Sequence, residues 1–124
     1  MERYSAKQIA DVLSCVRCGA CCSEEELHAM VQRTLLLAGI DTVHEAGIAP
    51  RCRIDFLAGN VGIEIKKSKP NRTALLAQLA RYAGSDRVEE LLVIAPRSVR
   101  LPKEIAGKRI EMLALERLWG ISLP

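Results

Sequence analysis

The stretch RIDFLAGNVGIEIKK, residues 53–67, consists of two mainly apolar runs on either side of Gly59-Asn60. A Gly-Asn pair between such runs is typical of a two-residue hairpin loop, which needs a positive φ. Counting outward from the loop pairs Ala58 with Val61 and places Asp55 opposite Glu64. The stretch therefore predicts a β-hairpin in which two carboxylates face each other.

The charges in this hairpin need a physical reason. Strand alternation puts Asp55, Glu64 and Lys66 on one face and the apolar side chains on the other: Ile54, Phe56, Val61, Ile63 and Ile65. Directly opposed like charges destabilise a sheet, and a divalent cation such as Mg²⁺ would compensate them. Lys66 could then stabilise charge that develops on a phosphate beside the ion. A solvent-exposed hairpin face with mixed charges is the alternative.

Length and composition narrow the class of protein. A chain of 124 residues is long enough for one core, and no apolar run approaches the roughly 20 residues of a membrane span, so a cytoplasmic protein without a membrane partner is expected. The net charge of +3 permits a polyanionic partner. Basic residues flank the hairpin, either as a solvated loop or as a stripe that positions phosphates: Arg51, Arg53, Lys66, Lys67, Lys69 and Arg72. Aromatic residues make up 3% of the chain, which argues against a base-stacking surface.

Capping residues and apolar periodicity predict the remaining elements. Ser23 and Glu26 form a capping-box pattern ahead of an apolar stripe, and Gly39 ends that helix. Helices are predicted at residues 5–13, 23–39 and 72–83, with a closing helical turn at 115–120. Strands are predicted at residues 42–46, in the hairpin, at 91–96 and at 109–115, and the uninterrupted apolar run at 91–96 favours a strand buried on both faces.

The spacing of Asp55 and Glu64-Ile65-Lys66, followed by a helix and a buried strand, resembles the PD-(D/E)XK nuclease superfamily, with Ile54 in place of the motif's proline. The likeness covers residues 23–118. It implies an α/β, restriction-endonuclease-like core, with a mixed central sheet of four to five strands flanked by helices in the order αβββαβ. An N-terminal helix and Cys-rich segment (1–22) would precede a single nuclease-like domain (23–124).

Two further features are similar to the RecB-like branch of that superfamily. Gln78-Leu79-Ala80-Arg81-Tyr82 matches its Q-x-x-x-Y motif, and His28 lies on the first core helix, where the branch carries a metal ligand. The resemblance implies Mg²⁺- or Mn²⁺-dependent phosphodiester hydrolysis with Asp55, Glu64 and Lys66 as catalytic residues. Its metal ligands would be Asp55, Glu64, the carbonyl of Ile65 and His28. Its DNA contacts would come from Gln78, Tyr82, Lys67, Lys69, Arg72 and Arg53.

Other interpretations of the same positions stay open. His28 could be a packed or surface histidine, in which case Glu24 or Glu25, one turn earlier, would replace it as ligand, since junction-resolving relatives carry a glutamate on that helix. His44 and Glu45 are weaker candidates on the edge strand. Tyr82 could belong to the core.

Cysteines form the second unusual pattern. Cys15, Cys18, Cys21 and Cys22 lie within eight residues, and Cys52 lies near the hairpin. The C-x₂-C-x₂-C spacing can chelate an Fe–S cluster or Zn²⁺, whereas small buried thiols in a reducing cytoplasm are the alternative. Several RecB-like nucleases carry a [4Fe-4S] cluster, with three cysteines near the C-terminus that this chain lacks.

The leading functional prediction is a metal-dependent DNA nuclease, a RecB-like exonuclease or end-processing enzyme. A Holliday-junction or flap endonuclease acting as a homodimer is a second possibility, because a small domain covers little of a duplex. A catalytically silent DNA-binding module and a cysteine-metal regulator are the alternatives from other classes.

Overall fold

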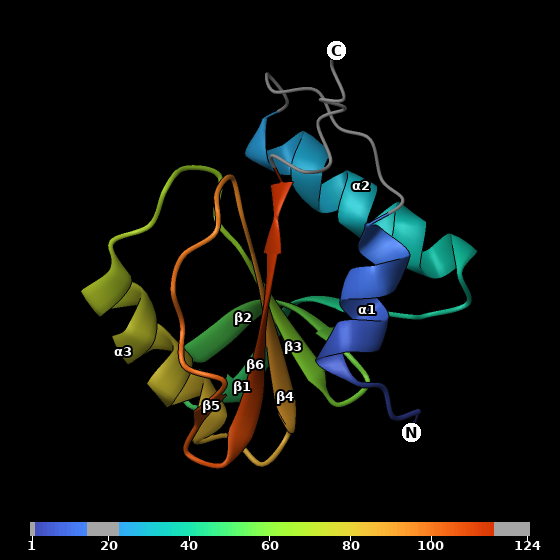
Figure 1. The fold of residues 1–124 in the computed structure, drawn as a ribbon. Coiled ribbons are helices and arrows are strands. Elements are labelled where there is room, and N and C mark those ends of the chain that lie inside the picture. The colour runs from blue at the N-terminus through green and yellow to red at the C-terminus, as the bar shows by residue number, and fades with distance from the viewer. Residues whose placement is uncertain (1, 15–22, 116–124) are drawn as a thin grey trace.

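Six strands form one mixed sheet, and three helices cover its two faces (Figure 1). The computed structural model describes residues 2–14 and 23–115. Its elements are α1 (Ala6–Leu13), α2 (Glu24–Leu37), β1 (Val43–Ala49), β2 (Cys52–Ala58), β3 (Val61–Ile65), α3 (Arg72–Ala83), β4 (Glu90–Ala95), β5 (Glu104–Ile105) and β6 (Lys108–Ala114). The strand order is β1-β2-β3-β4-β6-β5, in which β3, β4 and β6 are parallel and the other neighbours are antiparallel.

The predicted α/β class is confirmed, but the prediction of four to five strands is wrong. The strand that the sequence does not reveal is β5, which has two residues and turns into β6 through Ala106 and Gly107, both at positive φ. Two residues are too few for an alternating pattern to be detected. The edge strand β1 is also longer than expected, since it continues to Ala49.

Each face of the sheet has its own hydrophobic cluster. Helices α1 and α2 pack on one face, and α3 packs on the other (Figure 1). The first cluster combines the buried faces of α1 and α2 with Phe56, Ala58, Val61, Ile63, Ile65, Leu92 and Ile94. The second cluster combines the buried face of α3 with Ala46, Ile48, Ile54, Leu57, Leu91 and Val93. Strands β3 and β4 are therefore buried on both faces, as the apolar run of β4 predicts.

Side chains cap all three helices at their first turn. The Ser23 hydroxyl accepts a hydrogen bond from the Glu26 N–H, and the Glu26 carboxylate accepts one from the Ser23 N–H, which is the predicted capping box. Ser5 and Gln8 form the same arrangement in α1, and Asn71 caps α3. None of the helices within the described ranges has the length and apolarity needed to cross a membrane.

The β2–β3 hairpin has the predicted register from Ala58–Val61 to Phe56–Ile63, but the predicted pair Asp55–Glu64 is not part of the ladder and the predicted faces are wrong. Ala58 pairs with Val61 across the two-residue loop, and Gly59 has a φ of 58°. Ile54, however, packs in the α3-side cluster, although Phe56, two residues on, packs beneath α2. A Cβ on Gly62 would lie 2.6 Å from the Ile54 Cδ1 and 3.0 Å from Leu91, another member of that cluster. The prediction that Ile54 shares a face with Phe56 is therefore wrong.

The reversal of faces coincides with an unusual backbone conformation in the neighbouring strand. Glu45 in β1 has a φ of 50°, in the left-handed region, and the register places it opposite Asp55. His44, before it, stacks on Phe56, whereas Ala46, after it, packs on the α3 side with Ile54. Strict period-two alternation is thus broken in both strands at the level of Asp55.

The N-terminal segment is fastened to the tip of the hairpin. The Tyr4 N–H donates to the Asn60 side-chain carbonyl (2.6 Å), and the Asn60 amide donates to the Tyr4 carbonyl (2.8 Å). The Glu90 carboxylate accepts a hydrogen bond from the Ala6 N–H at the start of α1 (2.7 Å). Asn60 is itself buried, so its polar groups are satisfied within the protein.

Asn60→Ala tests this attachment. The substitution leaves the partly buried N–H and C=O of Tyr4 without these partners, and we expect the free energy of unfolding in urea to fall by about 1–3 kcal/mol. Gln32→Ala, which removes an exposed amide from α2, should change it by less than about 0.5 kcal/mol. Equal stabilities of the two variants would contradict the structural role of Asn60.

Candidate active site

The β2–β3 hairpin opens where its two carboxylates begin. Backbone pairing between the strands ends at Phe56 and Ile63. Beyond this pair, the Ile65 N–H donates to the Asp55 Oδ2 at 2.7 Å. The Asp55 carboxylate thus takes the place of a backbone acceptor of β2. It lies between the two strands rather than stacked against Glu64 on one face.

Glu64 is directed toward α3 and held there by three side chains. It is 5% exposed. The Tyr82 hydroxyl donates to its Oε1 at 2.9 Å, and Gln78 donates both to its Oε2 (3.2 Å) and to the Tyr82 hydroxyl oxygen (2.9 Å). The Lys66 Nζ lies 3.2 Å from the same Oε2. The i, i+4 spacing correctly places Gln78 and Tyr82 on one face of α3.

Burial and neighbouring charge shift the ionisation of this group. The pKa of Glu64 is raised, first by desolvation and then by the negative charge of Asp55, while Lys66 and the Tyr82 hydrogen bond act in the opposite direction. Burial and the Glu64 carboxylate raise the pKa of Tyr82 as well, so its hydroxyl keeps its proton and serves as a donor. The site therefore places a carboxylate where its charged form is disfavoured, as in many functional sites.

His28 approaches the opening from α2, on the other face of the sheet. Its Nδ1 lies 3.2 Å from the Nε2 of His44, whose ring stacks on Phe56 with a centroid separation of 4.7 Å. The His28 Nε2 is buried and has no hydrogen-bond partner within the described structure. The nearest carboxylate oxygens, Asp55 Oδ2 at 4.0 Å and Glu24 Oε2 at 3.9 Å, are too distant for hydrogen bonds.

These groups can be compared with the needs of a divalent cation. Among residues 2–14 and 23–115, no three His, Cys, Asp or Glu side chains surround one point as a finished metal site. The reason is visible in the orientations, since Glu64 is turned toward α3 while His28 and Asp55 face each other. Two ligands on one octahedral ion are about 3.0 Å apart when adjacent and about 4.2 Å when opposite, so the separation of 4.0 Å between His28 and Asp55 is compatible with shared ligation.

The orphaned nitrogen is the observation that favours a metal at this position. A buried imidazole nitrogen without a partner is costly, and a cation would satisfy it. Carboxylate oxygens and the Ile65 carbonyl are ligands that Mg²⁺ and Mn²⁺ accept. For Glu64 to bind the same ion, its side chain would have to turn away from Lys66. Asp55, Glu64 and the His28 Nε2 therefore supply donor types that a hard divalent cation accepts, although Glu64 is oriented toward α3 in this structure.

The predicted DNA-contacting residues occupy different surroundings. Lys69 and Arg72 are exposed near the start of α3. Lys67 is exposed as well. The pKa of Glu26 on α2 is lowered mainly by its hydrogen bonds with Ser23 and, to a smaller extent, by the charge of Lys67. Arg53 lies 3.8 Å from Glu45, and both side chains are exposed. Tyr82, by contrast, is 3% exposed. The DNA contact expected of Gln78 and Tyr82 stays a prediction. In the structure, both side chains donate hydrogen bonds to Glu64.

Other arrangements were not foreseen. From the sequence, His44 is only a weaker candidate ligand, whereas in the structure its Nε2 lies 3.2 Å from the Nδ1 of His28. Arg97 and Arg100 were not singled out, although they follow the buried strand β4, and the Arg100 carbonyl accepts a hydrogen bond from the Arg72 Nε (2.7 Å). Their position after a parallel strand is a signal that could have been used, because ligands bind beyond the carboxyl ends of such strands.

Cys52 is the one cysteine within the described ranges. It begins β2, is half-buried beside the α3-side cluster and forms no disulfide there. The predicted metal ligands Cys15, Cys18, Cys21 and Cys22 lie outside the described residues. The Fe–S or Zn²⁺ hypothesis for these cysteines stays a prediction.

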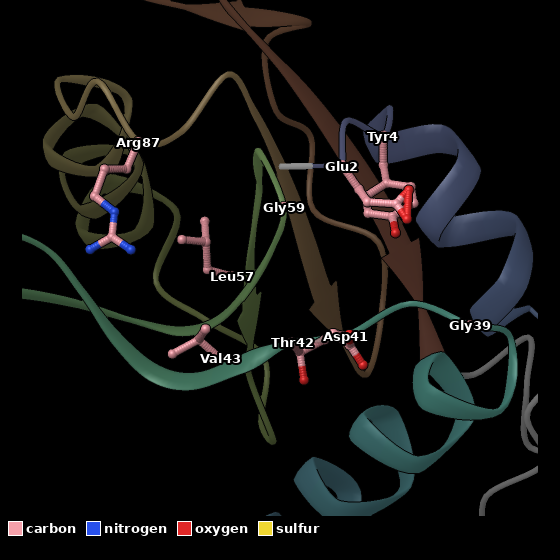
Figure 2. A pocket seen from close by; sticks show the side chains of 9 residues that line it. All are labelled: Glu2, Tyr4, Gly39, Asp41, Thr42, Val43, Leu57, Gly59 and Arg87. Carbon is pink, nitrogen blue, oxygen red and sulfur yellow. The ribbon is translucent and has the colours of Figure 1, made fainter.

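A separate pocket lies at the other end of the hairpin, beside the N-terminal segment. Figure 2 shows it between Arg87 on one side and Tyr4 and Asp41 on the other, with Leu57 in its wall. Its volume is about 300 Å³. The charged side chains stand apart around it rather than converging on one point. The cluster of ionisable groups at Asp55, Glu64 and His28 is therefore the stronger candidate for an active site.

Comparison of the chain with models of known protein families, with curated proteins and with solved structures gave no match.

The raised pKa of Glu64 has a measurable effect on stability. Below the unfolded-state pKa of about 4.3 the carboxyl is protonated in both states, and as pH rises through the higher folded-state pKa the folded protein loses stability relative to a neutral side chain. In EDTA, we therefore expect the free energy of unfolding of Glu64→Gln, relative to that of the unmodified protein, to rise between pH 5 and pH 8.

Urea unfolding at the two pH values measures this difference. Glu25→Gln, at an exposed position on α2, should have little effect at either pH. A stability difference between Glu64→Gln and the unmodified protein that stays constant or falls from pH 5 to pH 8 would contradict the raised pKa of Glu64.

Proposed function

We propose that this protein is a divalent-metal-dependent DNA nuclease of the PD-(D/E)XK type. The observation that carries the proposal is the convergence of Asp55, Glu64 and Lys66 at the opening of one hairpin, with the unpartnered His28 Nε2 at 4.0 Å from Asp55. Acidic ligands, a lysine and an open position for a substrate phosphate are what metal-assisted phosphodiester hydrolysis requires.

The arrangement of the elements supports the same proposal. From α2 to β4 their order is helix, three strands, helix, strand, which is the αβββαβ order of the restriction-endonuclease-like core. Strands β1 to β3 are antiparallel, and α3 connects β3 to the parallel strand β4. The Gln78 and Tyr82 side chains, which match the RecB-like motif, reach the proposed metal ligand Glu64.

Asp55, Glu64, the Ile65 carbonyl and His28 would hold the cation. When bound, Mg²⁺ or Mn²⁺ supplies Lewis-acid activation of the scissile phosphate and of the attacking water. The protein's own groups do the positioning. Tyr82 and Gln78 each donate one hydrogen bond to Glu64 and are joined to each other by a third, and the amide of Ile65 donates to one oxygen of Asp55.

Lys66 has two roles in this proposal. In the structure its Nζ neutralises Glu64 at 3.2 Å. If Glu64 turned away from Lys66 to hold the cation, the ammonium group would lose this partner and would be free to interact with a phosphate oxygen or with the attacking water. Its positive charge then stabilises the negative charge that develops on the phosphate in the transition state.

Lys66→Ala tests the catalytic assignment. We expect cleavage of labelled linear duplex, flap and four-way-junction DNA in Mg²⁺ or Mn²⁺ to fall by about 100-fold or more, with duplex binding changed little. Lys7→Ala is the control, because it removes an exposed lysine from α1 that does not contact Glu64 or the predicted DNA-binding residues, and it should retain activity.

The panel of substrates also separates the possible activities. Preference for linear ends would favour the end-processing enzyme, and preference for flaps or junctions would favour the structure-specific endonuclease. Metal-dependent cutting that survives Lys66→Ala would remove the basis of the mechanism. If the protein binds DNA but cuts none of these substrates, the catalytically silent DNA-binding module becomes the favoured function.

His44 should affect the metal affinity without binding the ion itself. A metal-binding histidine is oriented by the partner of its second ring nitrogen, and losing such a partner costs 10- to 100-fold in affinity. His44→Ala should therefore weaken Mn²⁺ binding by about 10- to 100-fold in titration calorimetry, whereas His44→Gln should retain part of it through its amide oxygen.

Gln32→Ala serves as the control for this experiment, because it removes an exposed amide from α2 that is not a candidate metal ligand. The idea that His44 orients His28 would be abandoned if His44→Ala bound Mn²⁺ as tightly as Gln32→Ala.

A further inference from the structure

The two loops that follow β3 and β4 are rich in cations and lack acidic residues. There is no Asp or Glu between residues 65 and 83 or between residues 91 and 103. Four exposed side chains in these segments form what is here called the carboxyl-edge basic surface: Lys69, Arg72, Arg97 and Arg100. None of them forms an ion pair with a carboxylate in the described part of the chain. Their charges are therefore available to a partner.

Topology brings these residues to one edge of the sheet. Strands β3 and β4 are parallel neighbours, so both loops leave from the same edge, as Figure 1 shows. The Arg72 Nε donates to the Arg100 carbonyl at 2.7 Å, which joins the second loop to the start of α3. Lys66 begins the first loop, so the proposed catalytic lysine and the basic surface lie on the same edge.

The other side of the candidate site has the opposite charge. A hollow of about 520 Å³ beside His28 is lined by Glu24, Glu25 and Glu45. On the basic side, a hollow of about 490 Å³ is lined by Lys66, Gln78 and Arg81 together with uncharged residues. A polyanion would be repelled by the first wall and attracted by the second, so the charges define one direction of approach.

We infer that the carboxyl-edge basic surface, with the loop at residues 96–103 as its outer part, binds the phosphate backbone of a DNA duplex and guides it to Glu64 and Lys66. This inference rests on the proposed nuclease function and adds the contact residues Arg97 and Arg100. Lys69, Arg97 and Arg100 lie in two loops and Arg72 lies at the start of α3, so the positive charges do not form a single row. This spread suits contacts with both phosphate backbones of a duplex.

The chemistry of the surface determines what it can recognise. Lysine and arginine bind phosphates without reading base sequence. A single-stranded partner would be bound largely through stacking on aromatic rings. Of the aromatic residues in the described ranges, Phe56 and Tyr82 are buried and Tyr4 packs against the cluster on the opposite face of the sheet. The surface therefore offers charge without stacking, and binding should be sequence-independent and salt-dependent.

The double variant Arg97→Ala/Arg100→Ala tests the inference. Fluorescence anisotropy in EDTA would measure binding of the full chain to two duplexes of unrelated sequence over a range of KCl concentrations. We expect binding at least about 10-fold weaker, equally for both duplexes, and a slope of log Kd against log salt that is smaller by about 2, since each phosphate contact contributes about 0.9.

Lys7→Ala/Arg33→Ala is the control, because it removes two exposed cations from α1 and α2 on the opposite face of the sheet. It should keep the slope of the unmodified protein. Equal slopes for the two double variants, or tighter binding of single-stranded DNA than of duplex by the unmodified protein, would overturn the inference.

Cleavage by the unmodified protein in Mn²⁺ distinguishes failure of this inference from failure of the proposed nuclease function. If the unmodified protein cuts duplex DNA while Arg97→Ala/Arg100→Ala binds DNA like the control, the carboxyl-edge basic surface does not bind DNA, but the nuclease function is retained. If the unmodified protein neither binds nor cuts any DNA, both proposals are wrong.

Discussion

The hydrogen bond from the Ile65 N–H to the Asp55 carboxylate is the contact on which the candidate site depends. If the hairpin ladder continued past Phe56 and Ile63, the register would hold two carboxylates directly opposite each other, where they repel. The side chain of Asp55 instead satisfies the backbone of β3 and opens the two strands. One carboxylate then lies between the strands and the other points to α3. The two carboxylates of the hairpin thus contribute to the candidate site instead of standing directly opposite each other in paired strands.

The two faces of the sheet contribute different chemistry to this opening. The α2 side supplies two imidazoles, one of which keeps a buried nitrogen without a partner. The α3 side supplies a hydroxyl, an amide and an ammonium group around Glu64. Because burial raises the pKa of Glu64, the folded protein bears an electrostatic cost at this position. A bound cation would offset that cost, which is the usual compromise between stability and activity.

Local sequence signals were enough for much of the fold. Gly59-Asn60 set the hairpin register, the Ser23–Glu26 pair marked the start of α2, and an apolar run identified β4. Features that depend on contacts between distant segments could not be obtained in this way. Ile54 and Phe56 pack on opposite faces of the sheet at the level where Glu45 in the neighbouring strand has a left-handed backbone, and period-two reasoning does not predict such a change. Spacing placed Gln78 and Tyr82 on one helical face, but only the packing of α3 on β3 shows that they meet Glu64.

The proposed function requires that His28, Asp55 and Glu64 hold a single divalent cation, and anomalous scattering from crystals of the full chain grown with Mn²⁺ would locate that ion. We expect one Mn²⁺ ion per chain in the opening of the hairpin, bound to carboxylate oxygens of Asp55 and Glu64 and to the His28 Nε2, with Glu64 turned away from Lys66. Crystals that bind no ion at this position, with Glu64 still paired to Lys66 and His28 unligated, would contradict it.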